Sequence, residues 1–254
     1  MAELRHQGKV AVITGATEGI GYAIAERLGK EGAKVVISSR KQKNVDQAVN
    51  NLRSQGIEVL GRICHVGKRE HREAVIEDAV SNYGGIDILV SNAAVNPIYG
   101  RMLKVTTEGV WDKIFDVNVK ASFFLIKSAL PYMKNRSGAS ITLISSISGY
   151  SPDNLFGVYC VSKTAMLGLA KNLALELAKY GIRVNCLSPG LIKTQLSKQL
   201  WDGRGETYIK SNIPLRKYGL PEDCGKVVSF LASKDAAFIT GESIVASGGQ
   251  VSRL

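Results

Sequence analysis

The chain has 254 residues, of which 45% are hydrophobic and 22% are charged, a size and composition that fit one globular α/β domain. No apolar stretch approaches the roughly 20 residues that a membrane-spanning helix needs, so the sequence predicts no membrane span. Lys and Arg outnumber Asp and Glu by 33 to 22, which favours an anionic partner. Because the basic residues are spread along the chain, a phosphate-bearing cofactor fits this excess better than nucleic acid does.

Short apolar runs rich in β-branched residues alternate with amphipathic stretches of helical length from Lys9 onward. This alternation is typical of repeated βα units around a parallel sheet. The predicted strands are Val10–Thr14, Lys34–Ser38, Glu58–Cys64, Ile86–Ser91, Ser140–Ile144, Arg183–Leu187 and Glu242–Val245. The predicted helices span about Ile20–Glu31, Asn44–Gln55, Arg69–Tyr83, Val110–Met133, Val158–Tyr180 and Glu222–Ala232.

One stretch, Leu191–Tyr218, is long, charged and poor in periodicity, which predicts a lid or substrate-binding loop. Trp201 in this loop is a candidate for the rim of a substrate site, whereas Trp111 is expected in a helix core. The helices Val110–Met133 and Val158–Tyr180 are expected to expose apolar stripes, a kind of surface that symmetric association usually buries.

The first βα junction reads VAVITGATEGIGYAIAERL and places Gly15, Gly19 and Gly21 between an apolar strand and an amphipathic helix. Glycines at such a turn let the backbone approach a pyrophosphate, whose charge is held by free N–H groups at the helix start. A glycine-rich turn alone is weak evidence, because glycine also serves turns and close packing. The strand before it, the helix after it and a second strand ending near Arg40 indicate a dinucleotide site.

The end of that second strand bears on the choice of cofactor. The sequence reads VVISSRK, with Ser39 and Arg40 where an acidic residue would bond the ribose 2′-hydroxyl of NAD. A guanidinium can instead hold a 2′-phosphate with charge-assisted hydrogen bonds. This favours NADP(H) over NAD(H); the alternative is that Arg40 only caps a strand end in solvent.

A second motif, Tyr159-x-x-x-Lys163, lies in a predicted amphipathic helix. The i, i+4 spacing puts both side chains on one face, so the Lys163 ammonium can stabilise a phenolate and lower the pKa of Tyr159. A tyrosine with such a pKa is a usable acid or base. A YxxxK match alone usually marks a surface pair, but Ser146 stands upstream in a serine cluster that follows an apolar strand.

Together these segments resemble the short-chain dehydrogenase/reductase family along the whole chain. The motifs that match are TGxxxGxG from Thr14 to Gly21, Asn118 in DVNVK, Ser91–Ala94, YxxxK, and the Pro189-Gly190 turn. The resemblance implies a single Rossmann-like, doubly wound α/β domain over residues 1–254 with a seven-stranded parallel sheet. It assigns catalytic roles to Asn118, Ser146, Tyr159 and Lys163. It assigns the cofactor to Gly15, Thr17, Gly19, Ile20, Gly21, Ser39, Arg40, Asn92, Tyr159, Lys163, Pro189, Gly190, Ile192 and Thr194.

The roles implied by the resemblance are specific. Tyr159 donates a proton to a carbonyl oxygen as hydride arrives from NADPH, and Ser146 polarises that oxygen. Lys163 lowers the pKa of Tyr159 and holds the nicotinamide ribose, while Asn118 anchors a water relay to Lys163.

Segments such as GGIDILVSNAAVNP and RVNCLSPGLIKT look most like those of family members that act as NADPH-dependent carbonyl reductases and retinol dehydrogenases. This closer resemblance implies a homotetramer that reduces aromatic ketones, α-dicarbonyls and retinal. Three positions depart from the general family pattern. Glu18 occupies a position that is often basic in NADP-preferring members, His65 replaces an aspartate that often contacts adenine, and Ala94 replaces the last glycine of an NNAG motif.

The sequence therefore predicts an NADPH-dependent carbonyl reductase that also works as an alcohol dehydrogenase, acts on a small molecule and holds no metal. An NAD-dependent alcohol oxidiser is the first alternative. A non-catalytic nucleotide-binding scaffold is the second, although such a scaffold is expected to lose Ser146, Tyr159 or Lys163.

The last three residues, Ser252-Arg253-Leu254, are a conservative variant of the SKL tripeptide that peroxisomal import reads at a free C-terminus. We therefore expect recognition by the peroxisomal import receptor and a peroxisomal location.

Overall fold

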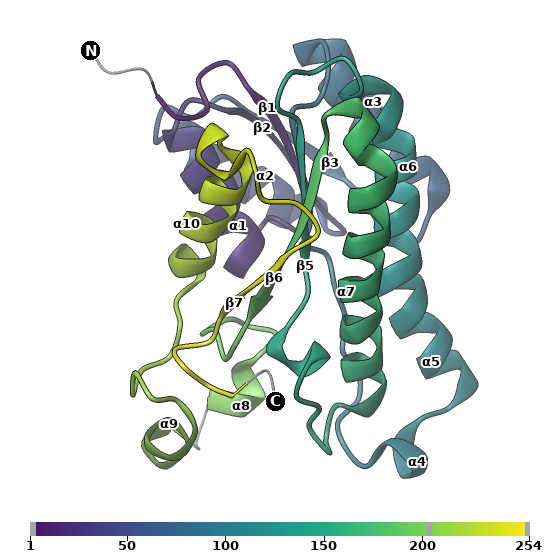
Figure 1. Cartoon of the computed structure of the whole chain (residues 1–254), viewed down its shortest axis with the longest axis vertical. Helices are drawn as coiled ribbons and strands as arrows, with labels where there is room; N and C mark the ends of the chain where they lie inside the picture. The colour runs from purple at the N-terminus through teal and green to yellow at the C-terminus, as the bar shows by residue number, and fades with distance from the viewer. Residues whose placement is uncertain (1–3, 202–204, 252–254) are drawn as a thin grey trace.

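Seven parallel strands form the centre of the molecule (Figure 1). The computed structural model describes residues 4–201 and 205–251. The strands pair in the order β3-β2-β1-β4-β5-β6-β7. Their bounds are β1 Val10–Thr14, β2 Lys34–Ser39, β3 Val59–Ile63, β4 Ile88–Ser91, β5 Ser140–Ile144, β6 Arg183–Pro189 and β7 Ser243–Ala246.

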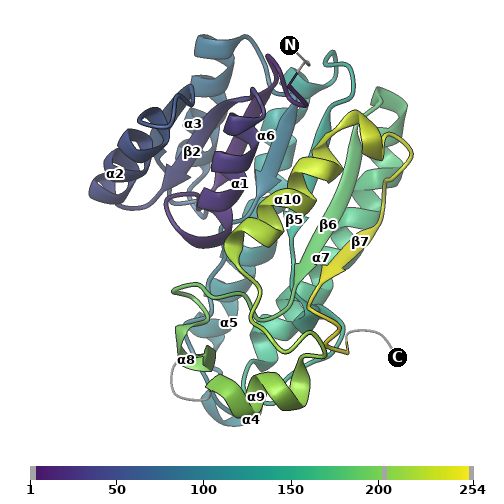
Figure 2. The same ribbon diagram turned by 90° about the vertical axis from the view of Figure 1, so that its left-hand side faces the viewer.

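Helices cover both faces of this sheet (Figure 2). One face carries α1 Gly19–Lys30, α2 Gln42–Arg53 and α10 Pro221–Ala232, and the other carries α3 Arg69–Tyr83, α6 Ala121–Met133 and α7 Gly157–Leu177. The central strands β1, β4, β5 and β6 are therefore buried along their whole length, which explains why their sequences are apolar rather than alternating.

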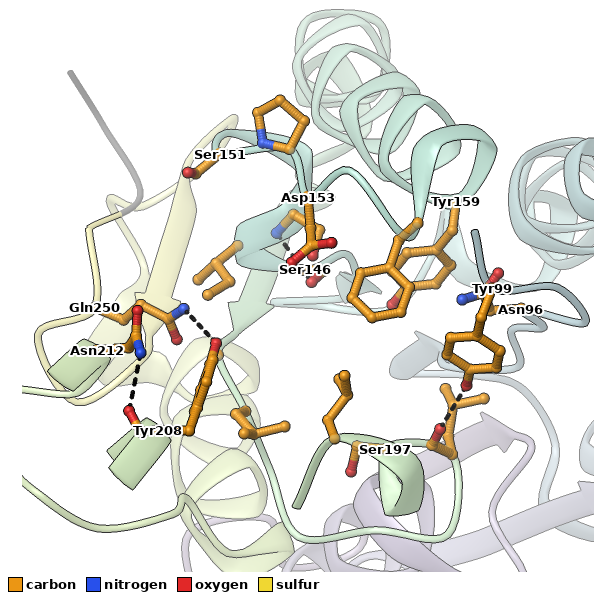
Figure 3. A pocket seen from close by; sticks show the side chains of 18 of the residues that line it. Asn96, Tyr99, Ser146, Ser151, Asp153, Tyr159, Ser197, Tyr208, Asn212 and Gln250 are labelled. Atoms are coloured by element: carbon orange, nitrogen blue, oxygen red, sulfur yellow. Dashed lines mark hydrogen bonds between the residues drawn. The ribbon is translucent and has the colours of Figure 1, made fainter. Parts of the chain in front are cut away.

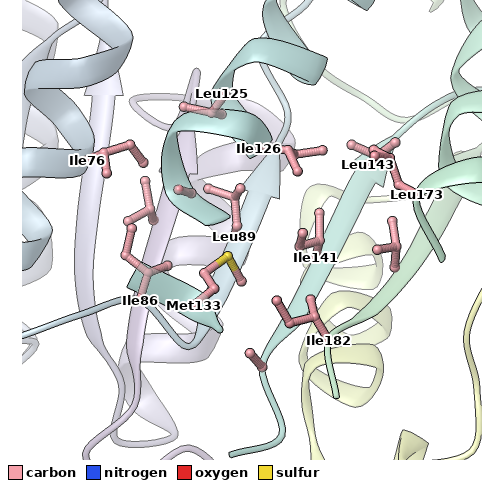
Figure 4. Close-up of a cluster of buried hydrophobic side chains, with 14 of the residues drawn as sticks. Ile76, Ile86, Leu89, Leu125, Ile126, Met133, Ile141, Leu143, Leu173 and Ile182 are labelled. Atoms are coloured by element: carbon pink, nitrogen blue, oxygen red, sulfur yellow. The ribbon is translucent and has the colours of Figure 1, made fainter. Parts of the chain in front are cut away.

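The core lies in two layers, one on each face of the sheet. On the α6 and α7 side, Leu89 and Ile141 from the sheet pack with Ile126 and Leu173 from the helices (Figure 4). On the opposite side, Ile13 and Ile37 belong to a second buried cluster with residues of α1, α2 and α10. One sheet between two helical layers is a doubly wound, Rossmann-like fold.

The strand order reverses between β1 and β4. The chain leaves β1 towards β2 on one side, and it leaves β4 towards β5 on the other. In open α/β sheets, ligands bind in the crevice outside the carboxyl ends of the strands at this reversal. The predicted glycine turn follows β1, and Asn92 follows β4, so both predicted cofactor segments flank that crevice.

The predicted strands are all present, and the bounds of β1, β5 and α3 agree with the prediction. The predicted single helix Val110–Met133 is wrong. It divides into α5 Glu108–Phe115, a π-helical turn over Asp116–Lys120 and α6. In that turn the N–H of Ala121 donates to the carbonyl of Asp116, an i→i+5 bond of the kind often found at functional sites.

The segment 191–218, which we name the lid, is not the plain loop that its weak periodicity predicts. It contains α8 Lys198–Trp201 and α9 Gly205–Asn212, which lie beyond the carboxyl ends of the strands near the short helix α4 Met102–Val105 (Figure 2). These helices are too short for a hydrophobic period to stand out from the sequence.

Trp111 does not lie in a helix core as predicted. Its ring is partly exposed on α5 and stacks on Phe115, with ring centroids 4.9 Å apart. Within residues 4–201 and 205–251, no helix is both long and apolar enough to cross a membrane. The same residues contain no cluster of three or more His, Cys, Asp or Glu side chains suited to hold a metal ion.

Candidate active site

A cavity of about 290 Å³ opens at the carboxyl ends of the strands, between α7 and the lid (Figure 3). Two of its sides face each other. The reactive wall consists of Ser146 and Tyr159, and the far wall consists of Tyr208, Asn212 and Gln250, which lie across the cavity from Tyr159. A volume at the lower end of the usual range for ligand pockets suits a small molecule rather than a polymer.

Ser146 follows β5 and begins a short 3₁₀ turn over Ile147–Gly149. Its Oγ accepts a hydrogen bond from the N–H of Ser148, 3.1 Å away, which orients the side chain towards the cavity. The Ser146 hydroxyl also lies near the phenol of Tyr159, close enough to favour the ionised form of that phenol. The two hydroxyl groups that the sequence predicts to act together therefore lie together in the structure.

Tyr159 and Lys163 lie on the same face of α7, as their i, i+4 spacing predicts. The Lys163 ammonium is 5.5 Å from the centroid of the Tyr159 ring and donates to the carbonyl of Ile144 at 2.8 Å. Lys163 is buried, whereas the Tyr159 ring is partly open to the cavity.

The prediction that Lys163 lowers the pKa of Tyr159 is wrong for the chain as it stands. Burial raises the pKa of Tyr159 to about 12, against a smaller lowering by the nearby Ser146 hydroxyl. Burial also lowers the pKa of Lys163 to about 8. Both shifts have one cause, since removing water disfavours the charged form of each group. At neutral pH, Tyr159 is thus a protonated phenol, the form able to donate a proton.

Several buried contacts fix the reactive wall against α7. Ser145 Oγ donates to the carbonyl of Lys163 at 2.8 Å, and Thr164 Oγ1 donates to the carbonyl of Gly149 at 2.8 Å. A Cβ at Gly149 would come within 2.9 Å of the Lys163 backbone, so only glycine permits this close approach. The turn after β5 is therefore locked to the helix that carries Tyr159.

Asn118 lies in the π-helical turn and is buried. Its Oδ1 accepts from the N–H of Val95 at 2.8 Å, and its Nδ2 donates to the carbonyl of Val95 and to Ser162 Oγ. Ser162 Oγ in turn donates to the carbonyl of Tyr159 at 2.7 Å. The side chain that the sequence assigns to a water relay thus joins the segment after β4 to α7, beside the first turn of that helix.

The glycine turn after β1 forms a close-fitting cradle. Gly15 and Gly19 have positive φ angles of 63° and 57°, which favour glycine. A Cβ at Gly21 would lie 2.4 Å from the Gly15 carbonyl and 2.5 Å from Asn92 Nδ2. Asn92 Nδ2 donates to the carbonyls of Thr14 and Gly15 at 3.0 and 2.8 Å, so the ends of β1 and β4 are tied together at the crevice.

The remaining predicted residues of this region differ in exposure. Thr17 and Ile20 are half-buried in the first βα junction, and Ser39 is half-buried at the end of β2. Arg40 and Glu18 are exposed, and no ion pair joins these two described side chains.

The predicted residues after β6 approach the cradle from the other side. Ile192 is buried, and a Cβ at Gly19 would meet Thr194 Cγ2 at 3.3 Å. The Trp201 indole donates to the carbonyl of Thr194 at 3.0 Å. Trp201 therefore anchors the lid and is not among the side chains that line the cavity, unlike the rim position predicted for it.

The predicted substrate loop does line the cavity, through Tyr208 and Asn212 among others, although the sequence did not single these two residues out; Asn96, Tyr99 and Gln250, which also line it, were missed. Tyr99 packs edge-on against Phe156 and donates to the carbonyl of Leu196 in the lid at 3.4 Å. Their positions in the sequence could have indicated them, because binding sites in this fold gather where parallel strands end. Asn96 and Tyr99 come soon after β4, and Gln250 comes soon after β7.

Comparison with known proteins agrees with this geometry. Residues 15–250 match the family model described as enoyl-(acyl carrier protein) reductase. Human dehydrogenase/reductase SDR family member 4 is 56% identical over 247 residues, which cover 97% of this chain and 88% of the human protein.

Two solved structures are also similar. L-sorbose reductase from Gluconobacter frateurii, complexed with NADPH and L-sorbose, has a TM-score of 0.92 and 32% identity, with all of both chains covered. A blue fluorescent protein from a metagenomic library, in complex with NADPH, has a TM-score of 0.88 and 28% identity over 96% of this chain and 98% of its own.

The family model, the sequence relative and the shared fold agree with the motifs found along the chain. The chain is therefore an oxidoreductase that belongs to the short-chain dehydrogenase/reductase family.

Proposed function

We propose that the chain is an NADPH-dependent carbonyl reductase, working reversibly as an alcohol dehydrogenase, with ketones, α-dicarbonyls and retinal as candidate substrates. The observation that carries this proposal is the pairing of Ser146 and Tyr159 hydroxyls at the wall of a small cavity, with Lys163 buried behind them. Two hydroxyl groups that converge on one point are suited to hold and protonate a single carbonyl oxygen.

The cradle at β1 fits a dinucleotide. Gly15, Gly19 and Gly21 leave room that any Cβ would fill, and α1 begins at Gly19 with no side chain bonded to its first N–H groups. Free N–H groups at a helix start attract phosphate. The pyrophosphate would lie on this turn, and Thr194 lies over Gly19 where it can contact the nicotinamide end. The bound cofactor supplies the hydride.

The side chains of this chain then do the acid–base work. Tyr159, a protonated phenol at neutral pH, donates its proton to the carbonyl oxygen, and Ser146 hydrogen-bonds that oxygen and so stabilises the charge that develops there. Lys163 places a positive charge behind the phenolate that remains. Because Lys163 has a pKa of about 8, this charge is present at neutral pH and is lost in alkaline solution.

The preference for NADPH rests on Arg40. It is exposed at the end of β2, next to Ser39, where its guanidinium is free to meet a 2′-phosphate. The two similar solved structures, L-sorbose reductase and the blue fluorescent protein, are complexes with NADPH. Fluorescence titration with NADPH and NADH tests this preference, and comparable dissociation constants would favour the NAD-dependent alternative.

A screen of the purified chain with NADPH tests the reaction itself. Aromatic ketones, α-dicarbonyls and retinal should be reduced at different rates, with loss of cofactor absorbance matched by alcohol formation. Absence of turnover with all three classes, from a sample that binds NADPH, would contradict the proposed activity and favour a nucleotide-binding scaffold.

We also propose that the chain forms a homotetramer. Apolar side chains are exposed along α5, α6 and α7, among them Trp111, Phe124, Val161 and Leu175, and surface of this kind is usually covered by symmetric association. Sedimentation at micromolar concentration should give a tetramer, and a monomer would contradict the proposal.

The proposed location is the peroxisome, through Ser252-Arg253-Leu254, which lie outside the described residues. A fluorescent protein fused to the N-terminus should give a punctate signal, and deletion of Leu254 should make that signal diffuse while activity is retained. A diffuse signal from both fusions would show that the tripeptide is not read.

A further inference from the structure

We propose that Asp153 favours ketone substrates that also carry an ammonium group, which binds its carboxylate while the carbonyl lies between Ser146 and Tyr159. This inference rests on the proposed function, because it takes the reaction to occur at those two hydroxyl groups. It goes further in naming the charge that the rest of the substrate should carry.

The carboxylate of Asp153 is open to the cavity. Asp153 belongs to the loop between the turn after β5 and the first residue of α7, Gly157. It is exposed and lines the cavity, and Figure 3 shows its side chain directed inward from that loop. A ligand that lies against Ser146 and Tyr159 can therefore reach this charge with another part of the same molecule.

Hydrogen bonds fix the position of Asp153 but leave one of its oxygens free. Asp153 Oδ1 accepts from the N–H of Leu155 at 2.7 Å, and the backbone carbonyl of Asp153 accepts from the N–H of Phe156 at 3.1 Å. Within residues 4–201 and 205–251, Oδ2 makes no hydrogen bond and no ion pair. The carboxylate is therefore held at the cavity with an acceptor that a cationic donor can use.

Asp153 sets the charge of the cavity. Among the described residues that line it, Asp153 is the one with a formal charge, although the whole chain carries a net charge of +11. Tyr208 and the exposed Asn212 also line the cavity, but their neutral groups can accept from a cation or donate to an anion. Lys163 does not line it, and its ammonium donates to the carbonyl of Ile144. The lining therefore attracts a cation and repels an anion.

The rest of the lining suits an apolar body between the carbonyl and the ammonium group. Phe156, Leu191, Leu196 and Leu200 contribute apolar surface to it. An ammonium group at the edge of such a body meets Asp153, whereas a carboxylate at the same place would lie near a like charge. Because Asp153 is exposed, solvent screens the attraction, so the effect is a preference among ketones and not a strict requirement.

Acetophenones that carry a small group at the meta or the para position test the inference. The groups are aminomethyl, which is a cation at neutral pH, the isosteric neutral ethyl, and carboxylate. The measured quantity is kcat/KM at saturating NADPH, expressed as the ratio of the cationic ketone to the ethyl ketone within each enzyme. This ratio cancels differences in the folded fraction, and its comparison between enzymes cancels the intrinsic reactivity and hydration of each ketone.

Asp153→Asn is the decisive variant, because it removes the charge and keeps an oxygen that can accept from Leu155. The ratio should be about fivefold higher in the wild-type chain than in this variant at one or both ring positions. The corresponding ratio for the carboxylate ketone should change in the opposite direction. Asp153→Glu, which keeps the charge, should retain about half of the wild-type ratio or more.

Asp46→Asn is the matched control. Asp46 is exposed on α2 and does not line the cavity, so the substitution changes the net charge by the same amount and should leave the ratio unchanged. Salt gives a second measurement, which remains informative if Asp153→Asn fails to fold. Raising NaCl from about 0.05 M to about 0.5 M should lower the wild-type ratio, because salt screens exposed charges.

Equal ratios in the wild-type chain and Asp153→Asn at both ring positions, or a wild-type ratio that salt does not change, would overturn this inference and leave the proposed function intact. A fall of the same size in Asp46→Asn or in Asp153→Glu would also overturn it, because the cause would then be the overall charge or the shape of the loop. No reduction of any of these ketones by the wild-type chain, with either cofactor, would overturn the proposed function and this inference together.

Discussion

The two walls of the cavity differ in how firmly they are held. The reactive wall rests on β5 and α7, which are joined by buried hydrogen bonds such as Lys163 to Ile144 and Ser145 to Lys163. The far wall rests on the short helix α9 and on the chain after β7, which are joined at the side-chain level by the bond from Gln250 to Tyr208. The two reactive hydroxyls thus lie on firmly joined elements, and the opposite wall lies on a more lightly tied segment.

The largest effect on the reactive wall is expected from Tyr159→Phe. We expect kcat for ketone reduction to fall by about 10²- to 10⁴-fold, because the proton donor is removed while the ring is kept. NADPH binding, measured by fluorescence titration, should be retained. Tyr132→Phe, an exposed tyrosine on α6, serves as the control, and a Tyr159→Phe enzyme with more than a tenth of wild-type turnover would contradict the role of Tyr159.

Lys163→Met should reduce kcat/KM by about 10²-fold, because it removes the positive charge behind the phenol. It should also weaken NADPH binding, since the ribose loses a donor. Lys171→Met, a change of the same kind at an exposed position of α7, should leave both quantities close to wild type.

The pH dependence of ketone reduction tests the role of the Lys163 charge in a second way. Lys163 has a pKa of about 8 and is charged below it, whereas Tyr159 keeps its proton to about 12. Reduction by the wild-type chain should therefore decline as the pH rises through about 8, and this decline should be absent in Lys163→Met. A wild-type profile that stays flat up to pH 10 would contradict the role given to the Lys163 charge.

The contrast between the walls also explains how much could be predicted from the sequence. The reactive wall follows from local spacing, because Tyr159 and Lys163 share a helix face and Ser146 follows a strand with a strong apolar pattern. Likewise, the glycine turn is visible because a strand and a helix flank it. Such features can be recognised from the hydrophobic periodicity of a single helix or strand.

The far wall could not be predicted in this way. Tyr208 and Gln250 belong to distant segments, and only the packing of the lid brings them together. The burial that raises the pKa of Tyr159 is likewise a property of the assembled fold, so spacing alone gave the wrong direction. The π-helical turn at Asn118 was also missed, and the partners of that side chain, Val95 and Ser162, lie in other segments of the chain.

Arg40→Asp should have an intermediate effect, confined to the cofactor. Loss of a charge-assisted bond to the 2′-phosphate is expected to raise the Kd for NADPH by about 10- to 100-fold and to leave NADH binding equal or improved. Arg101→Asp, at another exposed arginine, is the control. Unchanged NADPH affinity in Arg40→Asp would mean that the guanidinium only faces solvent.

The smallest expected effect is at the lid. Trp201→Phe removes the hydrogen bond from the indole to the carbonyl of Thr194, and one neutral bond of this kind is worth about 1 kcal/mol. KM for a ketone should rise a few-fold while kcat stays within about twofold. A large fall in kcat with KM unchanged would mean that the lid shapes the reactive wall as well.

Transfer of deuterium from NADPH that carries deuterium at both C4 positions to an aromatic ketone, followed by mass spectrometry of the alcohol, tests the central claim most directly. We expect one deuterium on the carbinol carbon with the wild-type chain and almost none with Tyr159→Phe at equal cofactor occupancy. Equal deuterium incorporation by both enzymes, or an unlabelled alcohol from the wild-type chain, would contradict the assignment of this site as a carbonyl reductase.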